Sequence, residues 1–502
     1  MIKRRLTLSL FVLLLSAVNL NAAQRPPNIV VILADDLGYG SANCYGADVR
    51  HIRTPNIDRL AKEGMRFLDA NTPGSVCSPT RYALLTGRYA WRGRMKYGVL
   101  SPPEGPLLIE PELLTLPEYL KEHGYQTAHV GKWHLGYTSL DTVEDLSAQP
   151  LAPGPRSLGF DYHFGVPNNI DWLPKVYVEN ESIWGLRSKG KRPYGKSSYK
   201  GQPYHGYDAP QRVTTKVNQD LSDASREWIS KAVRQNPDRP FFLYHAQVAV
   251  HNPISPSEKW RGSSGAGAYG DFIHDVDHSV GEIIDALAYN NVLEDTIVIF
   301  TSDNGGDIGG VEEVHARELG FKNNGELRGD KHTIWQGGFQ VPFVVRWPGV
   351  IEPGSQCESM INVVDIFSTI QEIVGGEVLD PQTAAVDSFS FCSTLRGENA
   401  ETTGRATMVS NDVAGVVAIR LNEWKYIEDK VLRPLNNGMP PRKPQPQLFN
   451  LKQDPVEENN VIAEFPEIAM NMQEMLDRIR VQGSERTVAQ EARLLKTQAV
   501  AD

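Results

Sequence analysis

Two pairs of polar residues stand directly after apolar runs that read as buried strands. Asp35 and Asp36 follow one such run, and Asp303 and Asn304 follow another. Functional loops leave the carboxyl ends of strands in a parallel sheet, so these four side chains are expected to converge. Carboxylate and amide oxygens suit a hard divalent cation. Either pair alone is more often a turn, but two such endings in one sheet favour a metal site.

A third segment, from Cys77 to Arg81, combines a thiol and a guanidinium with a proline between them. Pro79 suits the first turn of a helix, which places Cys77 at the helix N-terminus. A helix N-terminus stabilises an anionic group at that position. Arg81, four residues further on, falls on the same helical face and can hold that group. The alternative is a buried structural thiol.

Alternating strand and helix patterns predict the scaffold that positions these residues. Continuous apolar runs predict strands at 28–34, 241–246, 296–301 and 341–347, and helical patterns lie at 56–64, 116–124 and 272–290. This alternation predicts a mostly parallel, three-layer α/β sheet. Further on, a hairpin-like stretch (415–427), a Pro-rich loop (440–446) and a helix from Pro466 predict a small α+β subdomain. The expected divisions are a signal peptide (1–23), a catalytic domain (24–395) and a C-terminal subdomain (396–502).

The first residues are typical of an export signal. A basic stretch, Lys3–Arg5, precedes an apolar stretch, Leu6–Val18, and the small residues Ala22 and Ala23 offer a cleavage site. A membrane anchor would need about 18 or more continuous apolar residues. We therefore expect an exported protein, periplasmic or secreted, that leaves the membrane after cleavage.

Composition and cysteine usage narrow the class of protein further. The 502 residues include 51 Lys and Arg against 61 Asp and Glu, a net charge of −10. This balance argues against a nucleic-acid partner, which needs a basic surface. Four cysteines are too few for a disulfide scaffold in a chain of this length. Whether Cys357 and Cys392 pair is left open by the sequence.

Together these motifs resemble the type I sulfatases of the alkaline phosphatase superfamily. The Cys-x-Pro-x-Arg core at Cys77, followed by Leu-x-Thr-Gly-Arg ending at Arg88, matches that family's maturation signature. The resemblance covers nearly the whole chain after the signal peptide. Further segments fall in family order: Asp35-Asp36, Gly131–Gly136, Ser302–Gly305, Leu327–Lys331, Val341–Phe343, Trp424-Lys425 and Leu448–Leu451.

The resemblance implies a fold, a modified residue and a metal. The fold is the alkaline phosphatase-like three-layer sandwich. A formylglycine-generating maturation enzyme oxidises the signature cysteine, here Cys77, to formylglycine, and one oxygen of its hydrate attacks sulfur. The implied ligands of Ca2+ are Asp35, Asp36, Asp303, Asn304 and the modified Cys77.

The resemblance also assigns roles to the remaining polar residues. Lys132 and Lys331 match the sulfate-binding lysines, and Arg81 would hold the modified residue. His251 is the candidate general acid, because a sugar alkoxide is a poor leaving group without a proton. His134 would take a proton when sulfate is expelled.

Substrate identity depends on weaker signals. His332 and Trp335 depart from residues common in the family, and the segment 91–97 adds Trp91 and Arg94 in a mixed basic and aromatic patch. The segment 185–200 carries six Lys and Arg and no acid, which would steer a polyanion unless it is simply a solvated loop. We expect a sulfated polysaccharide or its oligosaccharides, first a carrageenan-type galactan and next a glycosaminoglycan, with Trp91, Arg94, His332 and Trp335 as candidate substrate contacts.

Two other functions are compatible with parts of the sequence. A phosphonate or phosphate ester hydrolase of the same superfamily can share the formylglycine, and parallel assays on aryl sulfate and phosphate diesters would separate the two. A sulfated-glycan-binding protein without activity would keep its function when Cys77 is replaced by serine. All the expected catalytic positions are filled, which favours the enzyme.

Overall fold

The computed structural model describes residues 25–101, 105–138, 150–196, 203–376, 379–398, 405–430 and 445–489. The predicted signal peptide and most of the predicted Pro-rich loop lie outside these residues. Within these ranges, no helix combines the length and the apolar character needed to cross a membrane.

The described residues form a ten-stranded sheet whose five middle strands are parallel. These are β11 (Thr296–Ser302), β1 (Asn28–Ala34), β10 (Phe241–Ala246), β4 (Gln126–Lys132) and β5 (Tyr162–Val166). Nearly every residue in them is buried, as expected for parallel strands covered on both faces. Shorter strands flank them, joined mostly by antiparallel pairings: β12 (Phe343–Arg346), β2 (Met65–Phe67) and β13 (Ser355–Cys357) on one side, β6 (Val178–Glu179) and β7 (Ser182–Ile183) on the other.

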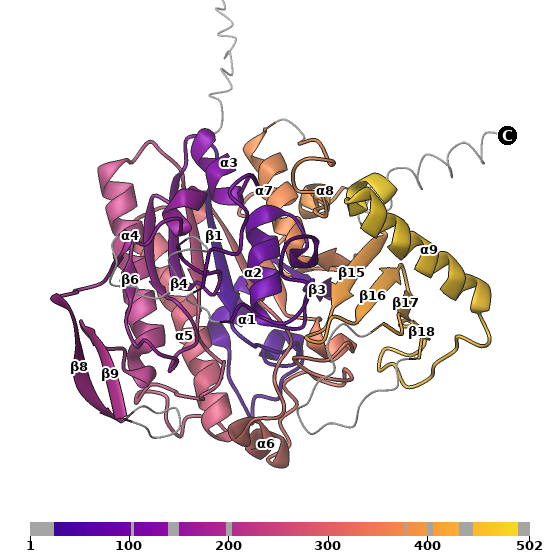
Figure 1. Cartoon of the computed structure of the whole chain (residues 1–502), viewed down its shortest axis with the longest axis horizontal. Helices are drawn as coiled ribbons and strands as arrows, with labels where there is room; N and C mark the ends of the chain where they lie inside the picture. The colour runs from indigo at the N-terminus through magenta and orange to yellow at the C-terminus, as the bar shows by residue number, and fades with distance from the viewer. Residues whose placement is uncertain are drawn as a thin grey trace, which may run out of the picture.

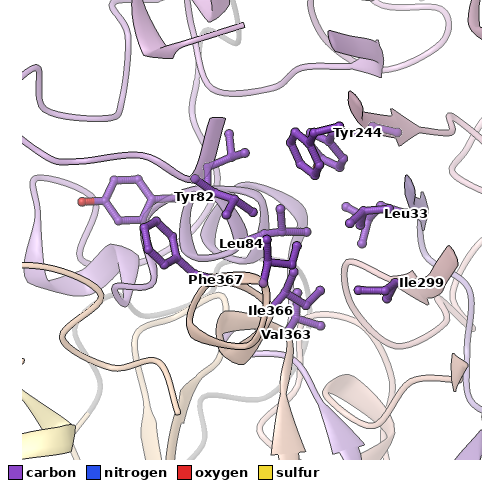
Figure 2. Close-up of a cluster of buried hydrophobic side chains, with 14 of the residues drawn as sticks. Leu33, Tyr82, Leu84, Tyr244, Ile299, Val363, Ile366 and Phe367 are labelled. Atoms are coloured by element: carbon purple, nitrogen blue, oxygen red, sulfur yellow. The ribbon is translucent and has the colours of Figure 1, made fainter. Parts of the chain in front are cut away.

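Alternate residues of β1 point into two separate apolar cores, which gives the three layers (Figure 1). Val30 and Ile32 pack with α1 (Pro55–Glu63), α4 (Val217–Gln235) and α5 (Gly267–Tyr289). Ile29, Val31 and Leu33 pack on the other face, with α2 (Cys77–Thr86), α3 (Leu116–Glu122), α7 (Ile366–Val374) and α8 (Cys392–Leu395). Figure 2 shows Tyr82 and Leu84 of α2 beside Phe367 and Ile366 of α7, with the strand residues Leu33 and Ile299 on the far side of Leu84. Helix α2 is thereby fixed at the centre of its layer.

The C-terminal region is a second, antiparallel sheet covered by one long helix (Figure 1). Its strands pair in sequence order, and Met472, Leu476 and Ile479 of the helix pack on its apolar face. The predicted mixed α/β fold with a small C-terminal subdomain is therefore correct. The elements are β15 (Thr407–Asn411), β16 (Val417–Leu421), β17 (Trp424–Ile427), β18 (Gln447–Asn450) and α9 (Pro466–Gln482).

Three smaller features complete the described fold. Strands β3 (Ala70–Asn71) and β14 (Ile361–Asn362) pair in parallel, and α6 (Val311–Glu318) follows the loop after β11. Strands β8 (Ser188–Lys196) and β9 (Pro203–Asp208) form an antiparallel hairpin beside the main sheet (Figure 1). All four cysteines lie in the described ranges and are free thiols, so Cys357 and Cys392 are unpaired here.

Candidate active site

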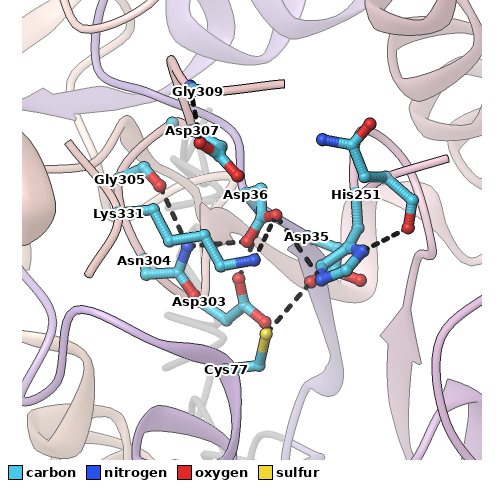
Figure 3. A network of polar contacts seen from close by, with 12 residues as sticks. Asp35, Asp36, Cys77, His251, Asp303, Asn304, Gly305, Asp307, Gly309 and Lys331 are labelled. Carbon is cyan, nitrogen blue, oxygen red and sulfur yellow. Dashed lines mark hydrogen bonds and ion pairs between the residues drawn. The ribbon is translucent and has the colours of Figure 1, made fainter. Parts of the chain in front are cut away.

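The two polar strand endings meet at the carboxyl edge of the main sheet. Asp35 and Asp36 follow β1 and Asp303 and Asn304 follow β11, and these neighbouring strands are in register at their last residues. The Asp36 amide donates to Asp303 Oδ1 at 3.1 Å, and Asn304 Nδ2 donates to Asp36 Oδ1 at 2.7 Å. All four residues are at most 2% exposed. The predicted convergence is confirmed (Figure 3).

Cys77 is the first residue of α2, and it points at this carboxylate cluster. Its Sγ donates to Asp35 Oδ1 at 3.7 Å. The thiol is 2% exposed, and this burial raises the pKa of Cys77 to about 12. Burial therefore outweighs the helix N-terminus, and an unmodified Cys77 stays a thiol at neutral pH.

Three cations surround the carboxylates. Arg81 donates through Nε and Nη2 to Asp303 Oδ2 at 3.0 and 2.7 Å. Lys132, the last residue of β4, donates through Nζ to Asp35 Oδ2 at 2.7 Å and lies 3.5 Å from Cys77 Sγ. Lys331 Nζ donates to Asp36 Oδ2 at 2.6 Å. All three cations are at most 5% exposed, so the centre is a densely charged, water-poor site.

The carboxylates respond differently to this environment. Burial opposes ionisation of Asp36, but the ammonium group of Lys331 holds the pKa of Asp36 well below its usual range. Burial and the neighbouring Asp35 carboxylate raise the pKa of Asp303 to about 6, against the opposing effect of Arg81. Asp36 is therefore held ionised, whereas ionisation of Asp303 is opposed unless further positive charge, such as a divalent cation, lies beside it.

The donor set fits a hard divalent cation. Ligand atoms of Asp35, Asp36, Cys77 and Asp303 lie within 4.8 Å of one another, and all four residues are buried. Asn304 Oδ1 is also buried, and within the described part of the chain no donor reaches it. A buried acceptor without a donor is costly, so an ion beside Asn304 Oδ1 would satisfy it.

Two histidines face the same centre. His134 is 2% exposed, and neither of its ring nitrogens has a protein partner among the described residues. Burial and the nearby Lys132 lower the pKa of His134 well below its usual value. His251 Nε2 lies 3.7 Å from Asp36 Oδ2, and burial together with Lys331 lowers the pKa of His251 to about 3. Both imidazoles are therefore neutral in this state.

Comparison with known protein families identifies the family of this chain. The sulfatase family model matches residues 27–376, which contain every strand ending and side chain described above. The chain belongs to the sulfatase family. It is therefore a sulfuric ester hydrolase.

Relatives of this sulfatase span almost its full length. The N-acetylgalactosamine-6-O-sulfatase of Bacteroides thetaiotaomicron is 32% identical over 491 residues, covering 90% of this chain and 93% of the relative. A solved sulfatase from work on metabolism of multiple glycosaminoglycans by that organism has a TM-score of 0.82 at 31% identity, covering 91% of this chain and all of that one. A structure in complex with k-i-k-neocarrahexaose has a TM-score of 0.70 at 25% identity and covers 92% and 94%.

The candidate substrate contacts of the sulfatase lie in different places. His332 follows Lys331 directly, is exposed, and has a left-handed φ of 78°. Trp91 stacks on Tyr89, at a ring-centroid distance of 5.7 Å, beyond the C-terminal end of α2. Arg94 donates to the carbonyl oxygens of 106 and 107, and Trp335 packs edge-on against a phenylalanine of β18. Of these four side chains, His332 is the one placed beside the charged centre.

The C-terminal subdomain of the sulfatase contacts two segments that carry site residues. Gly74, three residues before Cys77, forms a bridge with Asn411 of β15. Lys425 of β17 donates to the carbonyl of Ile334 at 2.8 Å and to Glu457 at 2.7 Å. These contacts hold both the start of α2 and the loop after Lys331.

Four polar residues near the centre of the sulfatase were not among the predicted site residues. Burial raises the pKa of Glu313 and of Asp330 to about 7, with Asp307 adding to both shifts. Asn252 donates to Glu313 Oε1 at 2.5 Å. Asp330, Asp307 and Asn252 each lie close in sequence to a predicted site residue, a signal that could have found them. Glu313 lies in the first turn of α6, where acidic residues are common, so the sequence gives no signal that it belongs to the site.

Proposed function

We propose that this sulfatase hydrolyses sulfate esters of a sulfated polysaccharide or its oligosaccharides, with formylglycine formed from Cys77 and one Ca2+. The observation that carries the proposal is the meeting of Cys77 with a buried carboxylate cluster in which Asn304 Oδ1 has no described donor. Three buried cations complete a centre suited to an anionic ester.

The state of Cys77 supports its modification. Because its pKa is raised to about 12, the thiol is a poor nucleophile at neutral pH. Formylglycine, once hydrated, supplies a nucleophilic oxygen at this position. We propose that a formylglycine-generating maturation enzyme makes the conversion.

The oxygen-rich donor set supports Ca2+. Bound Ca2+ would polarise the sulfate oxygens and favour ionisation of the hydrated formylglycine. The residues that would hold it are Asp35, Asp36, Asp303, Asn304 and the modified Cys77.

The side chains around the metal set perform the remaining tasks. Lys132 and Lys331 contact different carboxylates of the cluster and stabilise negative charge on the transferring sulfuryl group. Arg81 fixes Asp303 and the helix that carries the nucleophile. His134, neutral and without a described partner, is able to accept a proton when sulfate leaves.

His251 is proposed to protonate the leaving-group oxygen. Burial and Lys331 keep its imidazole neutral in this structure. Proton donation requires it to gain a proton together with the substrate, and the negative charge of the sulfate ester favours that uptake. The step moves one proton from His251 Nε2 to the departing alkoxide.

For the substrate, we propose a galacto-configured sulfated sugar within a polyanionic chain. The relative of highest identity described above acts on N-acetylgalactosamine 6-sulfate by its name, and a structural neighbour holds a carrageenan oligosaccharide. All nine residues of β8 are exposed, including Lys189, Lys191 and Lys196, so this basic strand is available to a polyanion. Such a substrate is met outside the cytoplasm, in keeping with the predicted export signal.

Mass spectrometry of the peptide around Cys77, from protein expressed with the maturation enzyme, tests the nucleophile. The proposal predicts conversion of the thiol to an aldehyde, and loss of sulfate release in a Cys77→Ala variant. Sulfate release is then measured on N-acetylgalactosamine 6-sulfate, carrageenan and glycosaminoglycan oligosaccharides. Full activity of Cys77→Ala, or a dominant rate on phosphate diesters, would overturn the proposal.

A further inference from the structure

Two polar side chains beside His251 take no part in the chemistry proposed above. Asn252 lies in the loop after β10, and Glu313 lies in the first turn of α6. Glu313 is 2% exposed, and within the described residues its Oε2 has no hydrogen-bond partner. Burying a carboxyl group in this way costs free energy, which calls for a compensating role.

The contact between these two residues continues to His251. Asn252 Nδ2 donates to Glu313 Oε1 at 2.5 Å, and the carbonyl oxygen of Asn252 lies 2.6 Å from His251 Nδ1. A carbonyl oxygen only accepts, so His251 Nδ1 carries a proton. Nε2 is then the nitrogen that faces Asp36 and the charged centre (Figure 3). The hydrogen bond at Nδ1 thus fixes the tautomer of the imidazole and the direction in which Nε2 points.

We propose that Glu313 is a positioning residue for His251, acting through Asn252 to hold the imidazole with Nε2 toward the leaving-group oxygen. The inference rests on the proposed role of His251 as proton donor. Among the described residues, Glu313 has no hydrogen bond or ion pair with the metal set; its contact with Asn252 joins the loop after β10 to helix α6.

Packing around Gly310 supports the same assignment. Gly310 precedes α6 with an ordinary extended backbone, φ −73° and ψ 162°. A Cβ at this position would lie 2.1 Å from Glu313 Oε2 and 2.7 Å from Asn252 Nδ2. The missing side chain leaves the space that this pair occupies. Gly310→Ala therefore displaces the Glu313 carboxyl group without backbone strain.

The competing role for Glu313 is structural, as an acid that favours the N-terminus of α6. Glu312 lies in the same turn, is the same type of residue and is only partly buried. Glu312→Ala is therefore a matched control for loss of a first-turn acid.

The test compares sulfate esters with leaving groups from 4-nitrophenol to an alkyl or sugar alcohol, because only the poorer leaving groups need a proton. We expect Glu313→Ala to lower kcat for the sugar or alkyl ester by about 10-fold or more, since small misplacements of catalytic groups are costly. The loss for 4-nitrophenyl sulfate should be much smaller. Glu313→Gln keeps an acceptor oxygen for Asn252 and should restore most of the rate.

Gly310→Ala should produce the same dependence on leaving group, and should add little when combined with Glu313→Ala because both act on one contact. Equal losses for all leaving groups, or an equal pattern in Glu312→Ala, would overturn the inference in favour of a structural role. Should Glu313→Ala fail to fold, Gly310→Ala carries the same comparison, with Glu313→Gln as the variant that should keep most of the rate.

His251→Ala, measured in parallel, separates failure of this inference from failure of the proposed function. A general acid contributes about 100- to 10,000-fold, so its removal should steepen the dependence on leaving group strongly. A flat dependence in His251→Ala would remove the proton-donor role itself. A steep one, together with a flat dependence in Glu313→Ala, would refute only the positioning role.

Discussion

Replacing Arg81 with methionine tests the buried charge balance of the site. The guanidinium group is 0% exposed, donates twice to Asp303 Oδ2 and once to the carbonyl oxygen of Lys132. Methionine keeps much of the side-chain volume but leaves Asp303 buried beside Asp35 with one cation fewer. Breaking a buried ion pair in this way costs about 3–5 kcal/mol. That is a large fraction of the stability of about 5–15 kcal/mol typical of a folded protein.

Urea unfolding followed by tryptophan fluorescence measures this cost, with EDTA present so that no cation compensates the carboxylate. We expect Arg81→Met to unfold at a clearly lower urea concentration. Adding Asp303→Asn removes the uncompensated charge, so the double variant should recover about half of the loss or more. A wild-type midpoint for Arg81→Met, or strictly additive losses in the double variant, would refute the reasoning.

Three further outcomes are expected. Removal of Ca2+ with EDTA should lower the midpoint temperature of thermal unfolding and abolish sulfate release. Asn304→Ala should weaken Ca2+ binding measured by calorimetry. An unfolding midpoint that EDTA leaves unchanged would count against the metal site. Burial raises the pKa of Asp277 to about 7, so its contribution to stability is complete below its unfolded pKa and is lost as pH rises through about 7. Asp277→Asn should therefore reduce the change in the free energy of unfolding with pH between about 4 and 7. If that change is the same in the variant, other groups cause the pH dependence. His332→Gly should relieve the left-handed backbone at φ 78° and raise stability by about 1 kcal/mol in urea unfolding, and a fall in stability would contradict this.

Much of the site could be predicted because short local sequence patterns determine where strands end and where helices begin. The predicted strands at 28–34 and 241–246 match β1 and β10, and α9 begins at Pro466 as expected. Since neighbouring parallel strands end at one edge, the strand pattern by itself was enough to bring Asp35 and Asp303 together. Cys77 at a helix start followed from Pro79 in the same way.

The parts that could not be predicted depend on burial and on contacts between distant segments. Strand β4 was not predicted, because its sequence, QTAHVGK, lacks the continuous apolar run of the other middle strands. The helix N-terminus favoured an ionised Cys77, but the extent of its burial depends on the whole fold, and burial reverses that expectation. Glu313 is separated from Asn252 by about 60 residues, so nothing local connects it to His251.

The bridge between Gly74 and Asn411 has a consequence for the order of events in biosynthesis. A ribosome makes Cys77 long before it makes β15 and β17, so the segment that enters α2 cannot reach its final contacts until more than 300 further residues have been added. In the finished molecule Cys77 is 2% exposed. An enzyme that alters Cys77 therefore has better access to it before these contacts form than in the folded protein.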